Sequence, residues 1–291
     1  MIEGSSREMD ALRYLGMYRF LSRAQIEEFV LGESPLSAHS REVGTWRILR
    51  RLRQRQLITT NALLAGDPDG MPTRIAYFLT ASGRRVFGAL EPGLPLRRPR
   101  VEGTFLLAHA LMVAEIALAF LRQARAHRDG DALIWECDWQ VAESLGRQPV
   151  APDARFIYET AQRRIHAFIE ADRGSERSRF FGRKIERYLD LYRGGSWRVR
   201  LPVWPLILTV TRTERRSSAL RGATEAIFSG RTEASRISRA FRFTSLDALR
   251  GSVGPFGEIW QVAGRTGRFP LIDVPVTVVD VPVERRESSG A

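Results

Sequence analysis

The sequence predicts an α+β protein made of two folded units, and three observations support this prediction. With 291 residues, the chain is long enough for two domains of ordinary size. Helical patterns followed by two β-prone runs fill the first part, and alternating helical and strand-like runs fill the rest. A stretch with three prolines at 92–101 separates the two parts. We therefore expect domains at 1–91 and 102–250, and an irregular extension with a strand at 251–291.

Capping residues and apolar periodicity predict three helices in the first unit. Asp10 stands at the start of the first helical pattern. Ser22 is expected to cap a second, short helix that ends near Leu31. A polar loop then leads to a third helix over about 40–56.

Two β-prone runs follow these helices. The runs at 57–60 and 74–79 are separated by a turn-rich loop, which predicts a hairpin. Residues 80–83 are expected to cap a last helix that continues to Leu90. Three helices and a hairpin form the order of a winged helix-turn-helix, in which the third helix enters the major groove of DNA.

The third helix carries a dense row of arginines. Its apolar residues recur every three positions and are expected to form one buried stripe, made of Val43, Trp46, Leu49 and Leu52. Exposed arginines can reach phosphates or guanine edges. The residues that we expect to contact double-stranded DNA are Arg41, Thr45, Arg47, Arg50, Arg51, Arg53, Arg55 and Arg74. Two other interpretations stay open: the arginines solvate an exposed face, or the unit is a protein–protein module.

The composition is typical of a basic protein that binds an acidic polymer. The net charge is +12 and the sequence pI is about 11.0, which favours nucleic acid, although anionic membranes and a GC-rich genome also account for such a charge. No apolar run approaches the length of a membrane span, and the N-terminus lacks the apolar stretch of a secretory signal. A single cysteine, Cys137, excludes an internal disulfide. We therefore expect a cytoplasmic protein without membrane association.

The second unit is predicted to begin with an almost wholly apolar helix at about 103–125, buried against a sheet. Its polar residues His109 and Glu115 are interpreted as satisfied core groups or as residues at an edge. The remaining elements are expected as strands at 132–139, 153–158, 164–171, 203–210, 241–244 and 272–283, and as helices at 175–192 and 214–228.

Acidic residues lie at the ends of two predicted strands. Asp153 opens one strand, and Glu170 and Asp172 end the next, on one face by alternation. Lys184, the only lysine of the chain, and Tyr188 lie one turn apart on the following helix. Carboxylates suit Mg²⁺ or Mn²⁺, and an ammonium can orient an attacking water. The predicted catalytic set is Asp153, Glu170, Asp172 and Lys184, with Asp153 and Glu170 as metal ligands. The alternative is a group of surface ion pairs with arginines.

These acidic motifs resemble those of the PD-(D/E)xK nuclease-like fold, which implies a restriction-endonuclease-like second domain. That pattern expects a lysine where this chain has Asp172, but some members carry it on the next helix, where Lys184 lies. The departure also fits a degenerate domain that does not cut DNA.

The chain as a whole resembles the replication-relaxation family of plasmid and mobile-element proteins. The resemblance spans roughly residues 10 to 210, and its motifs are Leu12–Phe20, Leu49–Leu52, Leu57–Ile58, Tyr77–Gly83, Pro152–Ala154 and Glu170–Glu176, with Lys184 and Tyr188. It implies a winged-helix DNA-binding protein of plasmid replication, relaxation or transfer, with replication or conjugation proteins as partners.

Three hypotheses follow. The chain is a DNA-binding protein of replication or transcription control, a divalent-metal nuclease targeted by the winged helix, or a module that assembles a larger complex. A homodimer is compatible with the first, since winged helices often read paired half-sites. The second requires Asp153, Glu170 and Lys184 to converge within a few ångströms.

Overall fold

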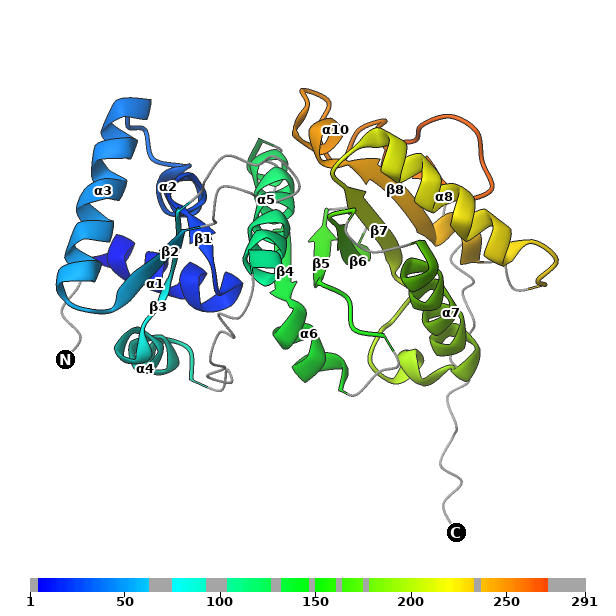
Figure 1. Ribbon diagram of the computed structural model, residues 1–291, viewed down its shortest axis with the longest axis horizontal. Coiled ribbons are helices and arrows are strands. Elements are labelled where there is room, and N and C mark those ends of the chain that lie inside the picture. The colour runs from blue at the N-terminus through cyan, green and yellow to red at the C-terminus, as the bar shows by residue number, and fades with distance from the viewer. Residues whose placement is uncertain are drawn as a thin grey trace, which may run out of the picture.

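Helix α5 (Thr104–Ala126) stands between an N-terminal helical unit and a second unit built on a mixed sheet (Figure 1). The computed structural model describes residues 5–62, 75–92, 104–126, 132–146, 150–160, 164–174, 178–232 and 237–271. Arg74, most of the 92–101 stretch and the strand predicted at 272–283 lie outside these ranges.

The first unit has the predicted order of three helices and a hairpin. Its elements are α1 (Ser6–Tyr18), β1 (Leu21–Ser22), α2 (Arg23–Leu31), α3 (Ala38–Gln54), β2 (Ile58–Ala62), β3 (Ile75–Leu79) and α4 (Ala81–Leu90). The strands form an antiparallel sheet in the order β1-β3-β2. The hairpin of β2 and β3 confirms the predicted pair of β-prone runs.

Two of the three predicted helix caps agree with the structure. The Ser22 hydroxyl accepts a hydrogen bond from the backbone N–H of Gln25, whose side chain accepts one from Ser22 in return. Thr80 caps α4 by accepting from Gly83. The prediction for Asp10 is wrong, because α1 begins earlier, where Ser5 accepts from the backbone N–H of Glu8.

The buried stripe of α3 also differs from the prediction. Trp46 is 52% exposed and Val43 is only partly buried, while the buried residues are Thr45, Ile48, Leu49 and Leu52. The physical reason is the helical period of about 3.6 residues: a run spaced by three drifts about 60° around the helix at every step. Four positions spaced in this way cannot all face the N-terminal core. Only Leu49 and Leu52 of the predicted stripe are therefore buried.

The second unit wraps helices around a mixed six-stranded sheet. After α5 come β4 (Ala132–Cys137), α6 (Asp138–Leu145), β5 (Ala154–Glu159), β6 (Arg164–Asp172), α7 (Ser178–Gly194), the 3-10 turn η1 (Ser196–Val199), β7 (Leu206–Thr211), α8 (Glu214–Phe228), the 3-10 turn η2 (Ser238–Ala240), β8 (Phe241–Ser245), α10 (Leu246–Arg250) and β9 (Gln261–Val262). The strand order is β4-β5-β6-β7-β8-β9. The β6–β7 and β7–β8 pairs are parallel, and the other pairs are antiparallel.

Two regions of this unit depart from the prediction. The strand predicted at 132–139 ends at Cys137, where the Gln140 side chain accepts from the backbone N–H of Cys137 and α6 begins. The sequence predicts that residues 251–271 belong to an irregular extension, but they include β9 and bury Trp260 completely in the core. Arg242 of β8 holds the end of this segment by donating to the carbonyl of Leu271.

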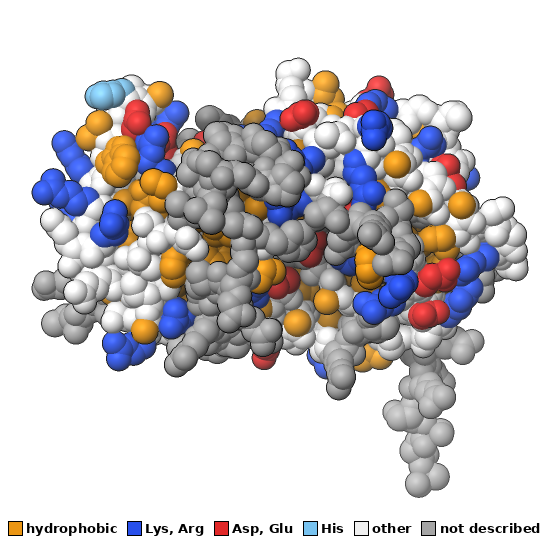
Figure 2. All heavy atoms as spheres, in the orientation of Figure 1, with side chains coloured by type: hydrophobic (Ala, Val, Ile, Leu, Met, Phe, Trp, Pro, Cys, Tyr) orange, Lys and Arg blue, Asp and Glu red, His pale blue; other side chains and the backbone are white. Residues whose placement is uncertain are grey.

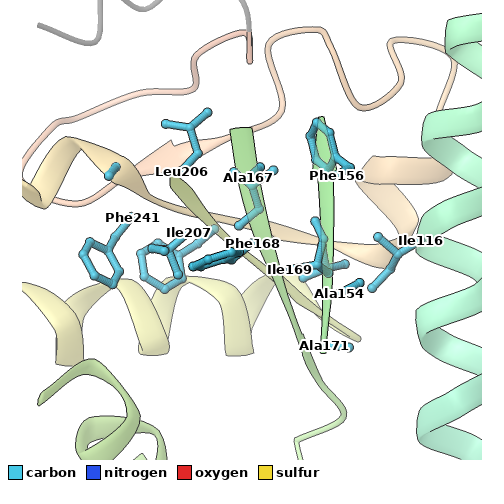
Figure 3. Close-up of a cluster of buried hydrophobic side chains, with 14 of the residues drawn as sticks. Ile116, Ala154, Phe156, Ala167, Phe168, Ile169, Ala171, Leu206, Ile207 and Phe241 are labelled. Carbon is cyan, nitrogen blue, oxygen red and sulfur yellow. The ribbon is translucent and has the colours of Figure 1, made fainter. Parts of the chain in front are cut away.

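The two faces of α5 belong to two hydrophobic clusters. Ile116 and Phe120 pack with the sheet, whereas Ala117 and Leu118 pack with the N-terminal helices. Figure 3 shows Ile116 beside the sheet, with Phe168 on the opposite side toward α8. By length and composition, 106–126 is also apolar enough to cross a membrane, contrary to the expectation from the sequence, but 56% of its most apolar window is buried in the protein. This burial is that of a core helix.

Candidate nucleic-acid interface and acidic cluster

The side of α3 that faces away from the N-terminal core presents arginines to solvent. Arg47, Arg50 and Arg53 are exposed, and within the described residues none of them forms an ion pair with an acidic side chain. Figure 2 shows basic side chains along the edge of the molecule that α3 forms in Figure 1. We call Arg47, Arg50 and Arg53 the outer arginines.

The other predicted contact residues of α3 lie differently. Arg51 and Arg55 reach back to α1 and share the buried carboxylate of Glu8, at 3.4 and 3.2 Å. The Arg41 guanidinium donates to the backbone carbonyl of Leu36. Thr45 is 1% exposed, and its hydroxyl donates to the carbonyl of Arg41. The prediction that Thr45 contacts DNA is therefore wrong, because its side chain belongs to the core.

A second candidate site lies where β5 and β6 adjoin. The backbone N–H of Asp153, just before β5, donates to the carbonyl of Ile169 at 3.0 Å, which places Asp153 beside Glu170. The backbone N–H of Ala171 donates to Oδ2 of Asp153 at 2.8 Å. Backbone hydrogen bonds between the neighbouring strands thus hold the Asp153 carboxylate in place beside Glu170.

Helix α7 brings two further polar groups to Glu170. Tyr188 donates its hydroxyl proton to Oε1 of Glu170 at 2.5 Å, and Lys184 forms an ion pair with Oε2. The spacing of one helical turn lets both side chains reach one carboxylate. Asp153, Glu170 and Lys184 therefore converge, as the nuclease hypothesis requires.

Helix α5 adds a residue to this site that the sequence did not assign to it. His109 Nε2 lies 3.1 Å from Oδ1 of Asp153. The sequence marked His109 only as a polar residue in an apolar helix. A polar residue in an apolar helix can indicate a functional site, but the partner of His109 is Asp153, which lies far along the chain just before β5. We call Asp153, Glu170, Lys184, Tyr188 and His109 the acidic cluster.

Asp172, the fourth predicted catalytic residue, does not join the acidic cluster. Its two carboxylate oxygens accept from Nε and Nη2 of Arg216 at 3.0 and 2.9 Å, and one of them also accepts from the backbone N–H of Gly174. This two-pronged pair ties the end of β6 to α8 and is structural in character. It corrects the prediction that Asp172 acts with the other acids.

Burial and charge shift the pKa values of the acidic cluster in opposite directions. Burial raises the pKa of Glu170 to about 7, although Lys184 opposes this shift. Burial would also raise the pKa of Asp153, but Lys184 and His109 outweigh it and hold this pKa well below its usual range. For His109, the effect of burial is overcome by Asp153, which raises the imidazole pKa. Two neighbouring carboxyls with separated pKa values are characteristic of functional sites.

The donor chemistry of the acidic cluster fits a hard divalent cation. Asp153 and Glu170 supply carboxylate oxygens, and each of these oxygens already contacts a side chain or a backbone N–H. A carboxylate oxygen has two lone pairs, so it can accept a hydrogen bond and bind a cation at the same time. Among the residues described, no group of three or more His, Cys, Asp or Glu is arranged around a metal position. A cation held by these two carboxylates would complete its coordination with water, as Mg²⁺ commonly does.

The acidic cluster borders a cavity of about 690 Å³ between the two units. We call it the inter-unit cavity. It is lined by Met17, Tyr18, Arg19, Phe20, Leu106, His109, Ala110, Val113, Cys137, Asp138 and Asp153. Its walls therefore come from the end of α1, from α5, and from the starts of α6 and β5.

Comparisons with known proteins agree with the resemblance seen in the sequence. A family model described as replication-relaxation matches residues 12–207, more than half of the chain. No curated protein matches the chain significantly. Among solved structures, the chain is similar to Bacillus subtilis PadR in complex with operator DNA, at 21% identity over 40% of this chain and 69% of that one. The TM-score of 0.22 is too low to support any argument.

Proposed function

Since the chain belongs to the replication-relaxation family, we propose that it binds duplex DNA in the replication or relaxation of a plasmid or mobile element. The outer arginines of α3 carry this proposal. They form a row of cations on an exposed helix beside the β2–β3 hairpin, in the arrangement of a winged helix-turn-helix. Phosphate contacts by such arginines would supply most of the affinity and make it depend steeply on salt.

A salt titration of duplex binding tests this proposal. In R47A/R50A, the slope of log affinity against log salt should fall by about 0.9 for each phosphate that an arginine no longer neutralises, and the affinity should drop about tenfold or more at moderate salt. The matched control is R198A/R200A, which removes the same charge from exposed positions in the second unit. An equal loss of affinity in both variants would mean that only bulk charge attracts DNA, and an unchanged affinity in R47A/R50A would remove the proposal.

A second function is favoured by the convergence of Asp153, Glu170 and Lys184. We propose a restriction-endonuclease-like second unit whose acidic cluster serves divalent-metal-dependent cleavage of DNA. Mg²⁺ or Mn²⁺ held by Asp153 and Glu170 would polarise a phosphodiester and activate water. The chain itself fixes Asp153 by the backbone N–H of Ala171 and orients Glu170 by Tyr188. Lys184 adds a positive charge beside Glu170.

Metal binding and cleavage can be measured separately. Calorimetry with Mn²⁺ should show binding to the wild type that D153N and E170Q lose. Incubation of supercoiled plasmid with Mg²⁺ or Mn²⁺ should show nicking that K184A lacks. D172N is the matched control, because Asp172 pairs with Arg216 outside the acidic cluster, and it should keep both properties. Absence of metal binding and of cleavage in the wild type would leave a non-cutting domain with this fold.

Cytoplasmic localisation, a homodimer and partners among replication or conjugation proteins stay predictions from the sequence. The alternative of a protein assembly module differs in predicting weak duplex binding that is insensitive to salt. The salt titration of duplex binding therefore also separates this alternative from DNA binding.

A further inference from the structure

The acidic cluster is accessible from the inter-unit cavity. His109 and Asp153 line this cavity, with side chains that are 27% and 20% exposed. The side chain of Glu170 is only 4% exposed and is therefore more deeply buried than these two. A molecule in the cavity would therefore meet Asp153 and His109 first.

Another part of the cavity wall presents a guanidinium from a strained turn. Arg19 has φ 65° and ψ −44°, and the backbone N–H of Phe20 donates to the carbonyl of Tyr18 at 2.8 Å. This is a γ-turn with positive φ, a rare conformation that is costly for a residue with a side chain. The side chain of Arg19 is held by Asp138 at 3.0 Å. The turn thus places the Arg19–Asp138 ion pair on the wall of the cavity, and such strain often occurs at binding sites.

The remaining walls are apolar. Leu106 is 44% exposed at the cavity, next to Ala110 and Val113 on α5. A volume of about 690 Å³ lies within the range of small-ligand sites. A nucleotide matches this combination, because its phosphate needs positive donors and its base needs an apolar surface.

We propose that the inter-unit cavity receives a nucleotide of an unpaired DNA strand, with its phosphate at Arg19 and His109 and its base against Leu106 and Val113. The inference rests on the proposed DNA binding and adds a second, strand-specific contact to it. A base inside a duplex is stacked and paired, so it has to leave the helix before such a cavity can hold it. The ligand class is therefore single-stranded DNA or an unpaired end, rather than an intact duplex.

The test uses a 5′-phosphorylated oligo(dT) of eight nucleotides and a blunt duplex as separate probes, in calorimetric titrations of the full chain. L106W places an indole at an exposed position of the cavity wall. It should weaken oligo(dT) binding about tenfold or more, the size expected when one base can no longer pack in its site, and leave duplex affinity unchanged. V199W is the matched control, because Val199 is 82% exposed and does not line the cavity.

A second measurement does not depend on filling the cavity. Cys137 is 3% exposed, so the thiol introduced by L106C would be the accessible one among the described residues. Oligo(dT) should slow its alkylation at least severalfold, and the blunt duplex should not. Equal alkylation rates with and without oligo(dT), or unchanged oligo(dT) affinity in L106W, would overturn the inference.

The two binding proposals can fail independently. R47A/R50A should weaken duplex binding about tenfold or more and keep the protection of the L106C thiol by oligo(dT). Loss of both properties in R47A/R50A would mean that oligo(dT) also binds at α3, which would overturn the cavity site. Protection without any duplex binding by the wild type would support the cavity site and remove the proposed winged-helix function.

Discussion

Trp46 and Leu49 lie three positions apart on α3 and have opposite surroundings. Trp46 is 52% exposed and lies 5.4 Å from the guanidinium of Arg23, measured from the ring centroid, whereas Leu49 is 1% exposed in the N-terminal core. The sequence treats both residues as apolar, and only the helical phase separates them. The stability of the unit should therefore depend on Leu49 far more than on Trp46.

Substitution of these two residues tests the observed stripe. L49A should lower the free energy of unfolding by about 2–5 kcal/mol, because it removes buried methyl groups and leaves a cavity. W46A should change it by about 0.5 kcal/mol or less, as is usual at exposed positions. Urea unfolding followed by circular dichroism measures both. Equal losses of stability would contradict the phase that the structure gives to α3.

At the scale of elements, one of the residues that cap the start of α2 also contacts a helix far along the chain. Ser22 and Gln25 cap the helix reciprocally, and the Gln25 side chain also donates to the carbonyl of Leu111 on α5 at 2.8 Å. The sequence predicts the Ser22 cap because the capping motif is local. It does not predict the contact with α5, which needs the folded chain.

The two residues predicted to cap the first and second helices, Asp10 and Ser22, provide a matched pair of variants. S22A should destabilise the protein by about 1 kcal/mol, since a backbone N–H at the start of α2 loses its acceptor. D10A should cost about 0.5 kcal/mol or less, because Asp10 lies within α1 and makes only a surface ion pair with Arg13. Thermal unfolding of both variants measures the difference. A larger destabilisation in D10A than in S22A would indicate that Asp10, as the sequence predicts, caps the first helix.

At the scale of the whole molecule, α5 couples the two units. Leu118 packs into the N-terminal cluster, and Ile116 packs into the cluster around the sheet. The proline-rich stretch suggests separate domains, and the predicted boundaries assign α5 to the second one. A helix buried on both sides makes independent unfolding of the two units costly.

We therefore expect one cooperative unfolding transition. L118A and I116A should each lower the midpoint of the same transition, with a destabilisation of about 2–5 kcal/mol, although their side chains belong to different clusters. Calorimetry combined with far-UV circular dichroism checks whether the transitions coincide. Two separate transitions, each moved by one variant, would show that α5 does not couple the units.

Much of the fold can be predicted because its signals are local. The three helices, the hairpin, the apolar α5 and five strands of the six-stranded sheet follow from apolar periodicity and capping motifs within short windows. Helix α6 and the folded segment 251–271 do not, since their stability comes from partners elsewhere in the chain. Trp139 of α6 donates to the carbonyl of Met17, and Trp260 is buried against the sheet unit.

By itself, the sequence determined most of the order of elements, the basic third helix, and Asp153, Glu170 and Lys184 as a candidate set. Only the tertiary structure decided which side chains meet. In the structure, the arginines of α3 divide into the outer arginines and a pair that binds Glu8. Asp172 pairs with Arg216 instead of joining the acidic cluster, and His109 contacts Asp153. The reason is that helix and strand periods fix the direction of a side chain from its neighbours in sequence. Its partner depends on how distant elements pack, and no local pattern contains that information.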